Sequence, residues 1–510
     1  MGAFGNMASK HVSDVGAGQG HFERAPPADA DNEMSFTIWE TIKRNPNSII
    51  YSLLLATGPM VYGYDLMVVN VIVAMPSFQM EFGSLINGSY IVPALWLALW
   101  NSMIQVGAIA GSLISGPISN RWGHCFWSRW FCCSRWLLIG VFLVYFADRC
   151  DTLDARRVVF MLGKILEGSG LAIMNATCLT LISEIAPPRV RGPLLSCFTL
   201  FTMVGQIIGV SATFAQIAIL DKSSYHVVLA VQRAKAYRRL HPKAEVDREV
   251  TFLQTVVEHE MDVQKGQESS NLIQCFKGTD FRRTRIIIYA FILQQFVGIT
   301  MVANATYFLE LAGISPNLSL TIVEMGLGIP SIIASWFTMT IFGHRAILLI
   351  GSLLSTVLWL AMGIAGCFPN SSTAMWFIGI VMVIIFVVYS LSVGAAYPDV
   401  AAESSSLHLR AASQSIGFFS QFLFGWLFSF TIPYMFGVDA GNLGGKVGFI
   451  FSALSVIAIA MVWFEIPEMK NRPFAELDEM FEKKIPTRQF NKYVCGGILP
   501  AITKAEQAGV

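Results

Sequence analysis

The sequence predicts an all-α integral membrane protein in which two helical bundles are joined by a polar connector. Only 14% of the 510 residues are charged and 54% are hydrophobic, whereas soluble domains carry about 25% charged residues. Apolar segments of the length that crosses a bilayer, about 20 residues, recur on both sides of residues 221–284. That middle segment is crowded with Lys, Arg, Glu and Asp. A long charged segment between two apolar halves is typical of a water-exposed connector between membrane bundles.

Eleven full spans are predicted, five before the connector and six after it. Gly and other small residues recur inside them, as close packing of membrane helices prefers. The predicted spans are 49–74, 91–114, 130–147, 157–183, 194–220, 285–311, 318–342, 346–367, 375–397, 412–436 and 447–465. This division gives an N-terminal tail (1–48), a first bundle (49–232), a connector with short helices (233–284), a second bundle (285–466) and a C-terminal tail (467–510).

The composition also excludes several classes of function. A formal net charge of +1 gives no sign of a nucleic-acid partner. The nine cysteines show no CxxC or Cys/His spacing, so we expect neither a metal site nor a disulfide framework. The sequence shows no nucleophile–base set and no phosphate-binding loop, so we expect no enzyme activity and no cofactor. Residues 1–33 lack the apolar core of a signal peptide and read as a largely disordered tail.

The basic residues of the loops predict the orientation in the membrane. Lys43 and Arg44 precede the first span and many Lys and Arg follow residue 466, which places both termini in the cytosol by the positive-inside rule. The outer loop at 148–157 is an exception, because it holds three arginines. Asn-x-Ser/Thr sequons in loops predicted to lie outside make three residues candidates for glycosylation. These are Asn87, Asn317 and Asn370.

The number of spans before the connector raises a problem of parity. Five crossings leave residue 221 outside, whereas the span at 285 must begin inside to fit the later loops. The only apolar run between them is 227–231, which is too short to cross about 30 Å of hydrocarbon. Either a sixth helix is largely missing, or one half is inserted the other way.

Charged side chains inside spans are costly and usually face a cavity or a partner. Asp65 lies in the first span, and Lys164 and Glu167 are one turn apart in the fourth, where they can pair with each other. Glu324 and Asp399 lie in spans of the second half. For each of these groups, local pairing and a role in the movement of substrate or protons are both open.

Two adjacent amides lie in the apolar segment FILQQFVGIT. Gln294 and Gln295 point about 100° apart on a helix, so at least one can face the bundle interior. An amide both donates and accepts hydrogen bonds, which suits a ligand with many hydroxyl groups. Hydrogen bonding between helices is the alternative interpretation.

Several motifs, in the right order, resemble those of the sugar-porter branch of the major facilitator superfamily. The likeness covers about residues 36–492, and CFKGTDFRRT at 275–284 is similar to the fungal α-glucoside (maltose-type) permeases. The other matching segments are Gly63-Tyr64-Asp65, GPISNRWGH at 116–124, SEIAPPRVRG at 183–192, QQFVG at 294–298, GHR at 343–345, the pair Glu403 and Arg410, and PEMKNR at 467–472.

The resemblance implies a major facilitator fold of the twelve-span type, with two pseudo-symmetric bundles and alternating access around a midplane site. It implies a sugar site at Gln294, Gln295, Gly298, Gln206 and Thr300, and proton coupling at Asp65 with Lys164 close by. It also implies ion-pair motifs that close a cytosolic gate. Their charged members are Arg121, Glu184, Arg191, Arg345, Glu403, Arg410, Glu468 and Arg472.

The resemblance therefore favours proton-coupled uptake of an α-glucoside at the plasma membrane, by a monomer whose partners are sugar, protons and the bilayer. The sequence departs from the α-glucoside pattern at Tyr62, Leu97, Ala395 and Phe422, and 227–231 matches only the start of the family's sixth span. The alternative hypothesis is a truncated or decayed relative without transport activity, or a nutrient sensor.

Overall fold

The computed structural model describes most of both halves of the chain. The described residues are 40–41, 43, 46–73, 75–86, 89–122, 126–186, 190–216, 272–303, 317–368, 371–406, 409–436, 441, 443–470, 472, 474–490 and 493. The side chains at 47, 69–71, 76, 86, 89–91, 94, 117–122, 126–135, 214–216, 317–321, 340, 436 and 474–475 are not among them. The truncated sixth span that the sequence predicts lies outside them, as do the sequon residues Asn87 and Asn370.

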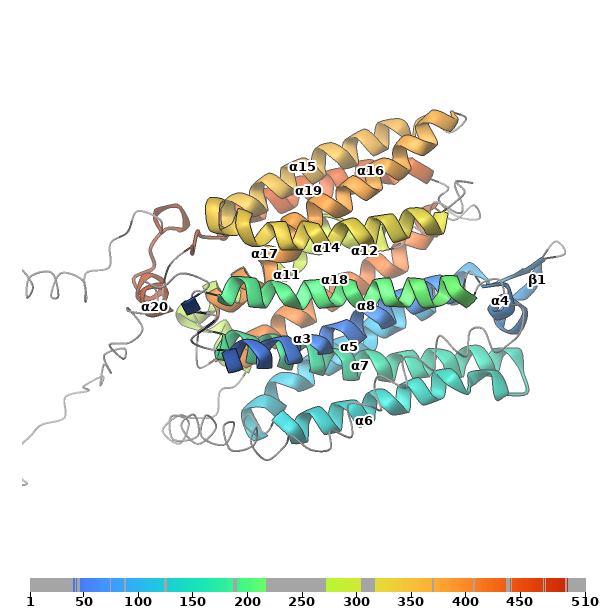
Figure 1. The fold of residues 1–510 in the computed structure, drawn as a ribbon, viewed down its shortest axis with the longest axis horizontal. Coiled ribbons are helices and arrows are strands. Elements are labelled where there is room, and N and C mark those ends of the chain that lie inside the picture. Colours follow the sequence, from blue (N-terminus) through green and yellow to red (C-terminus); the bar gives the residue numbers. More distant parts are fainter. Residues whose placement is uncertain are drawn as a thin grey trace, which may run out of the picture.

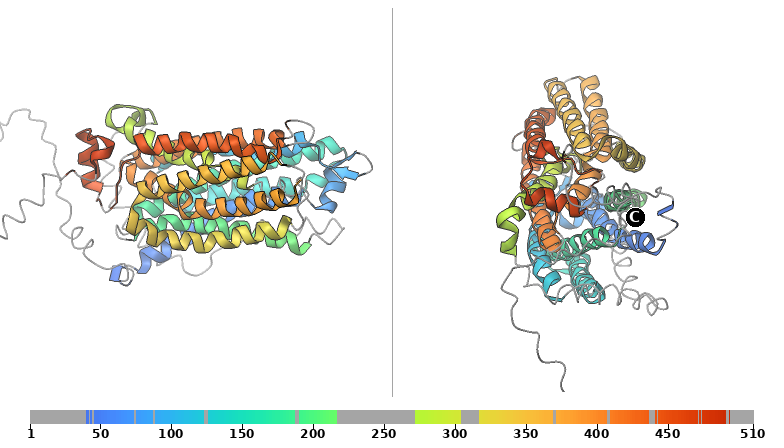
Figure 2. Two further views of the ribbon diagram at one scale, coloured as in Figure 1. Left: turned by 90° about the horizontal axis from the view of Figure 1, so that it is seen from above. Right: turned by 90° about the vertical axis from the view of Figure 1, so that its left-hand side faces the viewer.

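Long helices running side by side make up both halves (Figure 1). The first half contains α3 (Pro46–Ile72), α5 (Ala94–Trp122), α6 (Phe126–Tyr145), α7 (Leu153–Ile185) and α8 (Arg191–Gln216). The second contains α11 (Gly278–Phe296), α12 (Ile299–Ala303), α14 (Asn317–Phe342), α15 (His344–Ala365), α16 (Ser372–Leu391), α17 (Val393–Ser404), α18 (Arg410–Phe436) and α19 (Val447–Glu465). Seen end-on, the cyan helices of the first half and the yellow and orange helices of the second lie at opposite sides (Figure 2).

Short elements mark the two ends of the bundle. One end, called here the hairpin end, carries α4 (Pro76–Phe82) and the antiparallel strands β1 (Ser84–Ile86) and β2 (Ser89–Ile91) (Figure 1). The other, called here the α20 end, carries α20 (Phe474–Glu482). The remaining short elements are the 3-10 turns η1 (Ala147–Arg149), η2 (Leu272–Phe276), η4 (Gly444–Lys446) and η5 (Thr487–Gln489).

The directions of the helices bear on the parity problem. Helix α3 begins at the α20 end, and α8 finishes at the hairpin end (Figure 1). Helix α11 begins again at the α20 end, where Arg283 pairs with Asp478 of α20. The two halves therefore start from the same end, and the explanation that one half is inserted the other way is wrong.

Eight helical segments of the described chain are long and apolar enough to cross a membrane by length and composition. They are Leu95–Gly116, Leu153–Ile185, Arg191–Thr213, Ile322–Met339, His344–Ala365, Ser372–Ser404, Arg410–Met435 and Gly444–Glu465. The other three predicted spans correspond to α3, α6 and α11 with α12, which run through the same bundle (Figure 1).

Two predicted spans are broken where the sequence predicts continuous helices. The span at 285–311 is interrupted at Gly298, whose φ of +94° leaves the helical region. The span at 375–397 is interrupted at Ser392, where φ is −118° and ψ is −91°. Both breaks lie in the second half, next to side chains that point toward the first half.

Glycines let the helices of the first half approach one another closely, as the small residues in the predicted spans suggest. A Cβ atom on Gly107 of α5 would lie 1.9 Å from the carbonyl oxygen of Ile165 on α7. A Cβ atom on Gly63 of α3 would lie 1.9 Å from the carbonyl oxygen of Thr202 on α8. Backbones this close are typical of membrane helix interfaces built on small residues.

Replacement of Gly107 by Ala should therefore lower the thermal stability of the detergent-solubilised protein. Overpacking costs about 1–3 kcal/mol, so for a chain of this length we expect the melting temperature to fall by roughly 1–3 °C. Gly326→Ala is the control, because its added Cβ meets no atom within 4 Å in the described structure. Equal melting temperatures for the two variants would contradict the close packing of α5 on α7.

Candidate functional site: a polar cavity between the halves

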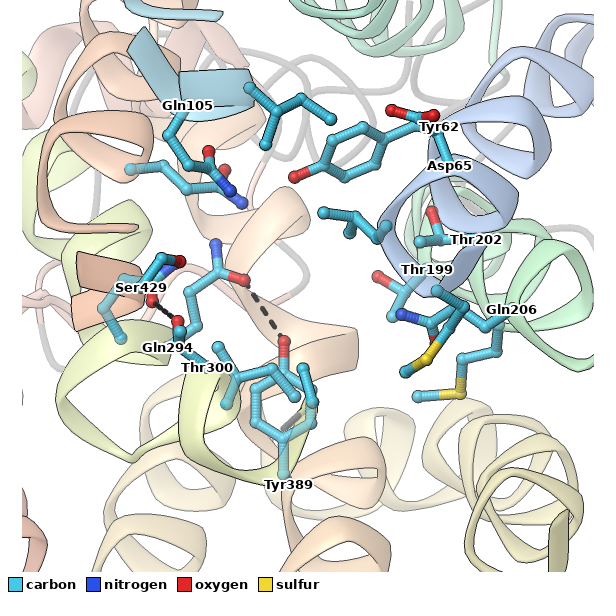
Figure 3. Close-up of a pocket in the computed structure, with 18 of the residues that line it drawn as sticks. Tyr62, Asp65, Gln105, Thr199, Thr202, Gln206, Gln294, Thr300, Tyr389 and Ser429 are labelled. Atoms are coloured by element: carbon cyan, nitrogen blue, oxygen red, sulfur yellow. Dashed lines mark hydrogen bonds between the residues drawn. The ribbon is translucent and has the colours of Figure 1, made fainter. Parts of the chain in front are cut away.

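A cavity of about 140 Å³ lies between the two halves. The first half contributes polar side chains from α3, α5 and α8, and the second from α11, α12, α16, α17 and α18 (Figure 3). The amides and hydroxyls among them are Tyr62, Asn101, Gln105, Thr199, Thr202 and Gln206, then Gln294, Gln295, Thr300, Tyr389, Tyr397, Gln421 and Ser429. A concave site with convergent polar groups is the usual form of a small-molecule site.

Four of the five predicted sugar-site residues line this cavity. Gln294, Gln295, Gln206 and Thr300 all face it, and the two neighbouring glutamines do so together. Gly298 is not a lining residue, but it forms the break between α11 and α12. The residues predicted from the two halves thus lie at or beside one cavity.

Hydrogen bonds fix the orientation of the two glutamine side chains. The Tyr389 hydroxyl lies 3.2 Å from Gln294 Oε1 and donates to it, and the Thr300 hydroxyl donates to Gln295 Oε1 (Figure 3). Gln294 Nε2 is buried, and its amide also lies within reach of the Tyr397 hydroxyl. Because both groups line the cavity, this amide is placed to exchange its partner for a ligand there.

The break at Gly298 explains how Thr300 reaches Gln295. The positive φ of Gly298 turns the chain, and a Cβ atom there would lie 2.7 Å from the Trp359 ring. Trp359 holds the turn from the other side, because its Nε1 donates to the carbonyl oxygen of Val297 at 2.8 Å. Only Gly suits such a conformation and such a close ring.

A cluster of three charged side chains lies at the α3 wall of the cavity. Lys164 Nζ is 2.7 Å from Asp65 Oδ1 and 2.6 Å from Glu167 Oε2, and all three side chains are 0% exposed. The predicted proximity of Lys164 to Asp65 is therefore present, and so is the local pair with Glu167. Asp65 lines the cavity (Figure 3).

Aromatic rings cover this cluster toward the hairpin end. Phe160, one turn before Lys164 on α7, has its ring centroid 6.0 Å from Lys164 Nζ. It packs against Trp100 at 5.0 Å, and against Phe78 and Phe82 of α4, each at 5.7 Å between centroids. The sequence gives no periodic signal for this layer, because its members come from three separate segments.

The arginines that violate the positive-inside pattern help to hold this layer. Arg157 is buried and donates to the carbonyl oxygen of Phe82 and to Ser84 Oγ, both at 2.9 Å. Arg156 pairs with Glu81 of α4 at 2.7 Å. These charges are engaged inside the protein, which accounts for their place in a loop predicted to lie outside.

Contacts between the halves close the cavity toward the α20 end. Ser115 of α5 hydrogen-bonds Ser415 of α18 at 2.8 Å, and Thr199 of α8 donates to the carbonyl oxygen of Gly394 at 2.7 Å. The rings of Phe198 and Phe418 lie 6.2 Å apart in an apolar cluster shared by both halves.

The predicted gating residues of the second half gather near this closure. His344 lies between two carboxylates, 3.8 Å from Asp399 Oδ2 and 3.6 Å from Glu403 Oε2. A Cβ atom on Gly192 of α8 would lie 3.4 Å from the same Asp399 oxygen, so the two halves meet here. Arg410 Nε donates to Ser405 Oγ at 3.2 Å.

The other predicted gating residues bind backbone groups as well as charged side chains, and Arg191 of the first half lies within electrostatic range of Asp399 and Glu403 in the second. Glu468 accepts hydrogen bonds from the first amides of α15, and Arg345 donates to the carbonyl oxygen of Trp463 at 2.8 Å. Arg472 pairs with Glu476 at 2.7 Å and also binds carbonyl oxygens. In the first half, Arg191 Nη2 donates to the carbonyl oxygen of Ala186 at 3.3 Å, Glu184 lies in the last turn of α7, and the side chain of Arg121 lies outside the described residues.

Comparison with known proteins identifies the family. The family model "Sugar (and other) transporter" matches residues 51–236 and 231–481. The MFS transporter fmqE of Aspergillus fumigatus is 28% identical, with 90% of this chain and 92% of the relative covered. The general alpha-glucoside permease of Saccharomyces cerevisiae is 25% identical, with 90% and 79% covered.

Solved structures agree on the fold. The proton:xylose symporter XylE bound to 6-bromo-6-deoxy-D-glucose superposes with a TM-score of 0.68 at 18% identity, covering 86% of this chain and all of that one. An inward open form of XylE from E. coli gives 0.65 at 20% identity, over 85% of this chain and 99% of that one. The family match over most of both halves and the shared fold show that the chain belongs to the sugar transporters of the major facilitator superfamily.

Proposed function

We propose that this protein takes up an α-glucoside together with protons by alternating access. The observation that carries the proposal is the position of Asp65, which faces the cavity while it pairs with Lys164 in a fully buried cluster. A carboxylate that contacts both a substrate cavity and a buried cation can exchange a proton where the substrate binds. Intramembrane charges commonly mark such pathways.

The chemistry of the cavity suits a sugar. Its amides and hydroxyls both donate and accept hydrogen bonds, as the hydroxyl groups of a sugar also do. Trp100 and Phe198 add apolar faces from the first half. The permeases named for α-glucosides and for maltose are 25% and 24% identical to this chain over 90% of its length, which supports this substrate class.

The contacts at the α20 end supply an inner gate. Hydrogen bonds such as Ser115 to Ser415 join the halves on one side of the cavity. Rocking of one half against the other would break them and open the site to that side. We assign the α20 end to the cytosol and the hairpin end to the outside of the plasma membrane, with both termini cytosolic and a monomer as the working unit.

Asp65→Asn should abolish uptake driven by a pH gradient, because an amide cannot carry the proton. Maltose uptake into proteoliposomes with and without an inward proton gradient measures this effect. Exchange of labelled for unlabelled maltose should persist, because it needs no net proton movement. Equal gradient-driven uptake by the variant and the parent would refute proton coupling at Asp65, and absence of any binding or exchange by the parent would favour the decayed or sensing relative.

Gln294→Leu should weaken sugar binding by removing an amide that lines the cavity. Loss of one or two hydrogen bonds to a ligand costs about 1.4 kcal/mol, which corresponds to roughly a tenfold rise in Kd. Isothermal titration with maltose measures it. Gln274→Leu is the matched control, because Gln274 lies in η2, outside the cavity lining. Equal affinities for the two variants would show that Gln294 does not contact the sugar.

Single-cysteine variants test the orientation. Cys367 is exposed at the hairpin end, just after α15. A membrane-impermeant maleimide added to intact cells should label a variant that retains only Cys367. Burial, with a smaller effect of Asp280, raises the pKa of the Cys275 thiol to about 11, so a variant that retains only Cys275 should stay unlabelled even in permeabilised cells. Labelling of Cys367 only after permeabilisation would reverse the assignment.

A further inference from the structure

The charged cluster holds one more carboxylate than a simple ion pair needs. Lys164 Nζ contacts Asp65 Oδ1 at 2.7 Å and Glu167 Oε2 at 2.6 Å, so the two carboxyl groups share one ammonium group. Asp65 faces the cavity, whereas Lys164 and Glu167 are not among its lining residues. Of the three side chains, only Asp65 lines the cavity, and the Glu167 carboxyl group lies close to Asp65 itself as well as to Lys164.

We propose that Glu167 is a working member of the proton-coupling site, and that it shares a single exchangeable proton with Asp65 across Lys164. The proposal rests on the proton coupling proposed above and assigns a role to a second residue. The proton forms an O–H bond with one of the two carboxylates and leaves from the same pair, so no other bond is made or broken.

The packing around Glu167 shows that its place is built into the helix interface. A Cβ atom on Gly140 of α6 would lie 2.8 Å from Glu167 Cγ and 2.7 Å from its backbone nitrogen. Any larger residue at 140 would displace the glutamate. Within the described residues, Glu167 Oε1 has no hydrogen-bond partner. A buried carboxylate oxygen in that state is costly, and the cost falls when the group is protonated.

Charge counting gives the reason for a second carboxylate. With all three groups ionised the cluster carries a net charge of −1, and one added proton makes it neutral. With Asp65 and Lys164 alone, the ionised pair is already neutral, and an added proton leaves a net charge of +1. Buried net charge is unfavourable in a membrane. Glu167 therefore makes the protonated cluster the neutral one.

The groups that face the cluster from neighbouring helices leave this count unchanged. On α3, Tyr62 and Tyr64 lie next to Asp65, and both are neutral phenols. Helix α5 brings the neutral amide of Gln105, and α8 brings that of Gln206, to the same cavity. Helix α6 contributes Gly140 at Glu167.

Two variants with opposite expected shifts test the proposal. In Glu167→Gln, the pH at which gradient-driven maltose uptake into proteoliposomes is half-maximal should move about 1–3 units toward acid, the range that a neighbouring charge produces. In Lys164→Gln, two carboxylates without a cation should bind the first proton more tightly, and the midpoint should move toward alkaline pH. A role in packing alone would lower the rate without moving the two midpoints in opposite directions.

Controls separate this proposal from misfolding and from the proposed function. Asp154→Asn changes an exposed carboxylate at the start of the same helix and should leave the midpoint unchanged. Glu167→Asp keeps the negative charge, so its pH of half-maximal uptake should lie close to that of the parent rather than to that of Glu167→Gln. An unmoved midpoint in Glu167→Gln, while Asp65→Asn abolishes coupling, would overturn the role of Glu167 alone. Gradient-driven uptake that survives in Asp65→Asn would overturn the coupling and this proposal together.

Discussion

The need to neutralise charge inside a membrane governs the arrangement of the first half. Lys164 carries the only positive charge within the buried cluster that it forms with Asp65 and Glu167, and each carboxylate contacts it directly. This contact joins α3 to α7. The rings around Phe160 cover the cluster toward the hairpin end. Side chains at the hairpin end thus help to shield the charged cluster.

The two halves differ in how their helices are built. In the first half, glycines such as Gly107 let straight helices pack tightly around the charges. In the second half, Gly298 and Ser392 interrupt helices beside the cavity. Broken membrane helices are tolerated where they line a cavity, because their freed backbone groups can find partners there. The first half therefore holds the charged cluster between closely packed helices, while the second places broken helices beside the cavity.

The sequence predicted the features that depend on one segment at a time. Span positions follow from runs of apolar residues. Gln294 and Asp65 were named as candidate site residues because a polar group within such a run costs free energy in the membrane. The breaks were missed, because Gly298 is ordinary in a membrane helix until Trp359 is seen to occupy the space of a Cβ atom. The role of Arg157 was missed for the same reason, since its partners lie more than 70 residues away. Contacts of this kind leave no local periodicity.

Helix α3 connects the charge state of the cluster to the closure of the cavity. Tyr62 lies one turn before Asp65, and its ring meets Phe422 of the second half edge to face, with 6.3 Å between centroids. Tyr62 and Asp65 both line the cavity, so a ligand bound there would meet the same turn of α3. Coupling between two ligands is reciprocal. It requires an element with two positions, and each ligand must bind more tightly to one position than to the other. Helix α3 carries the proposed proton site and a contact between the halves on one turn, so it meets that requirement without any longer pathway.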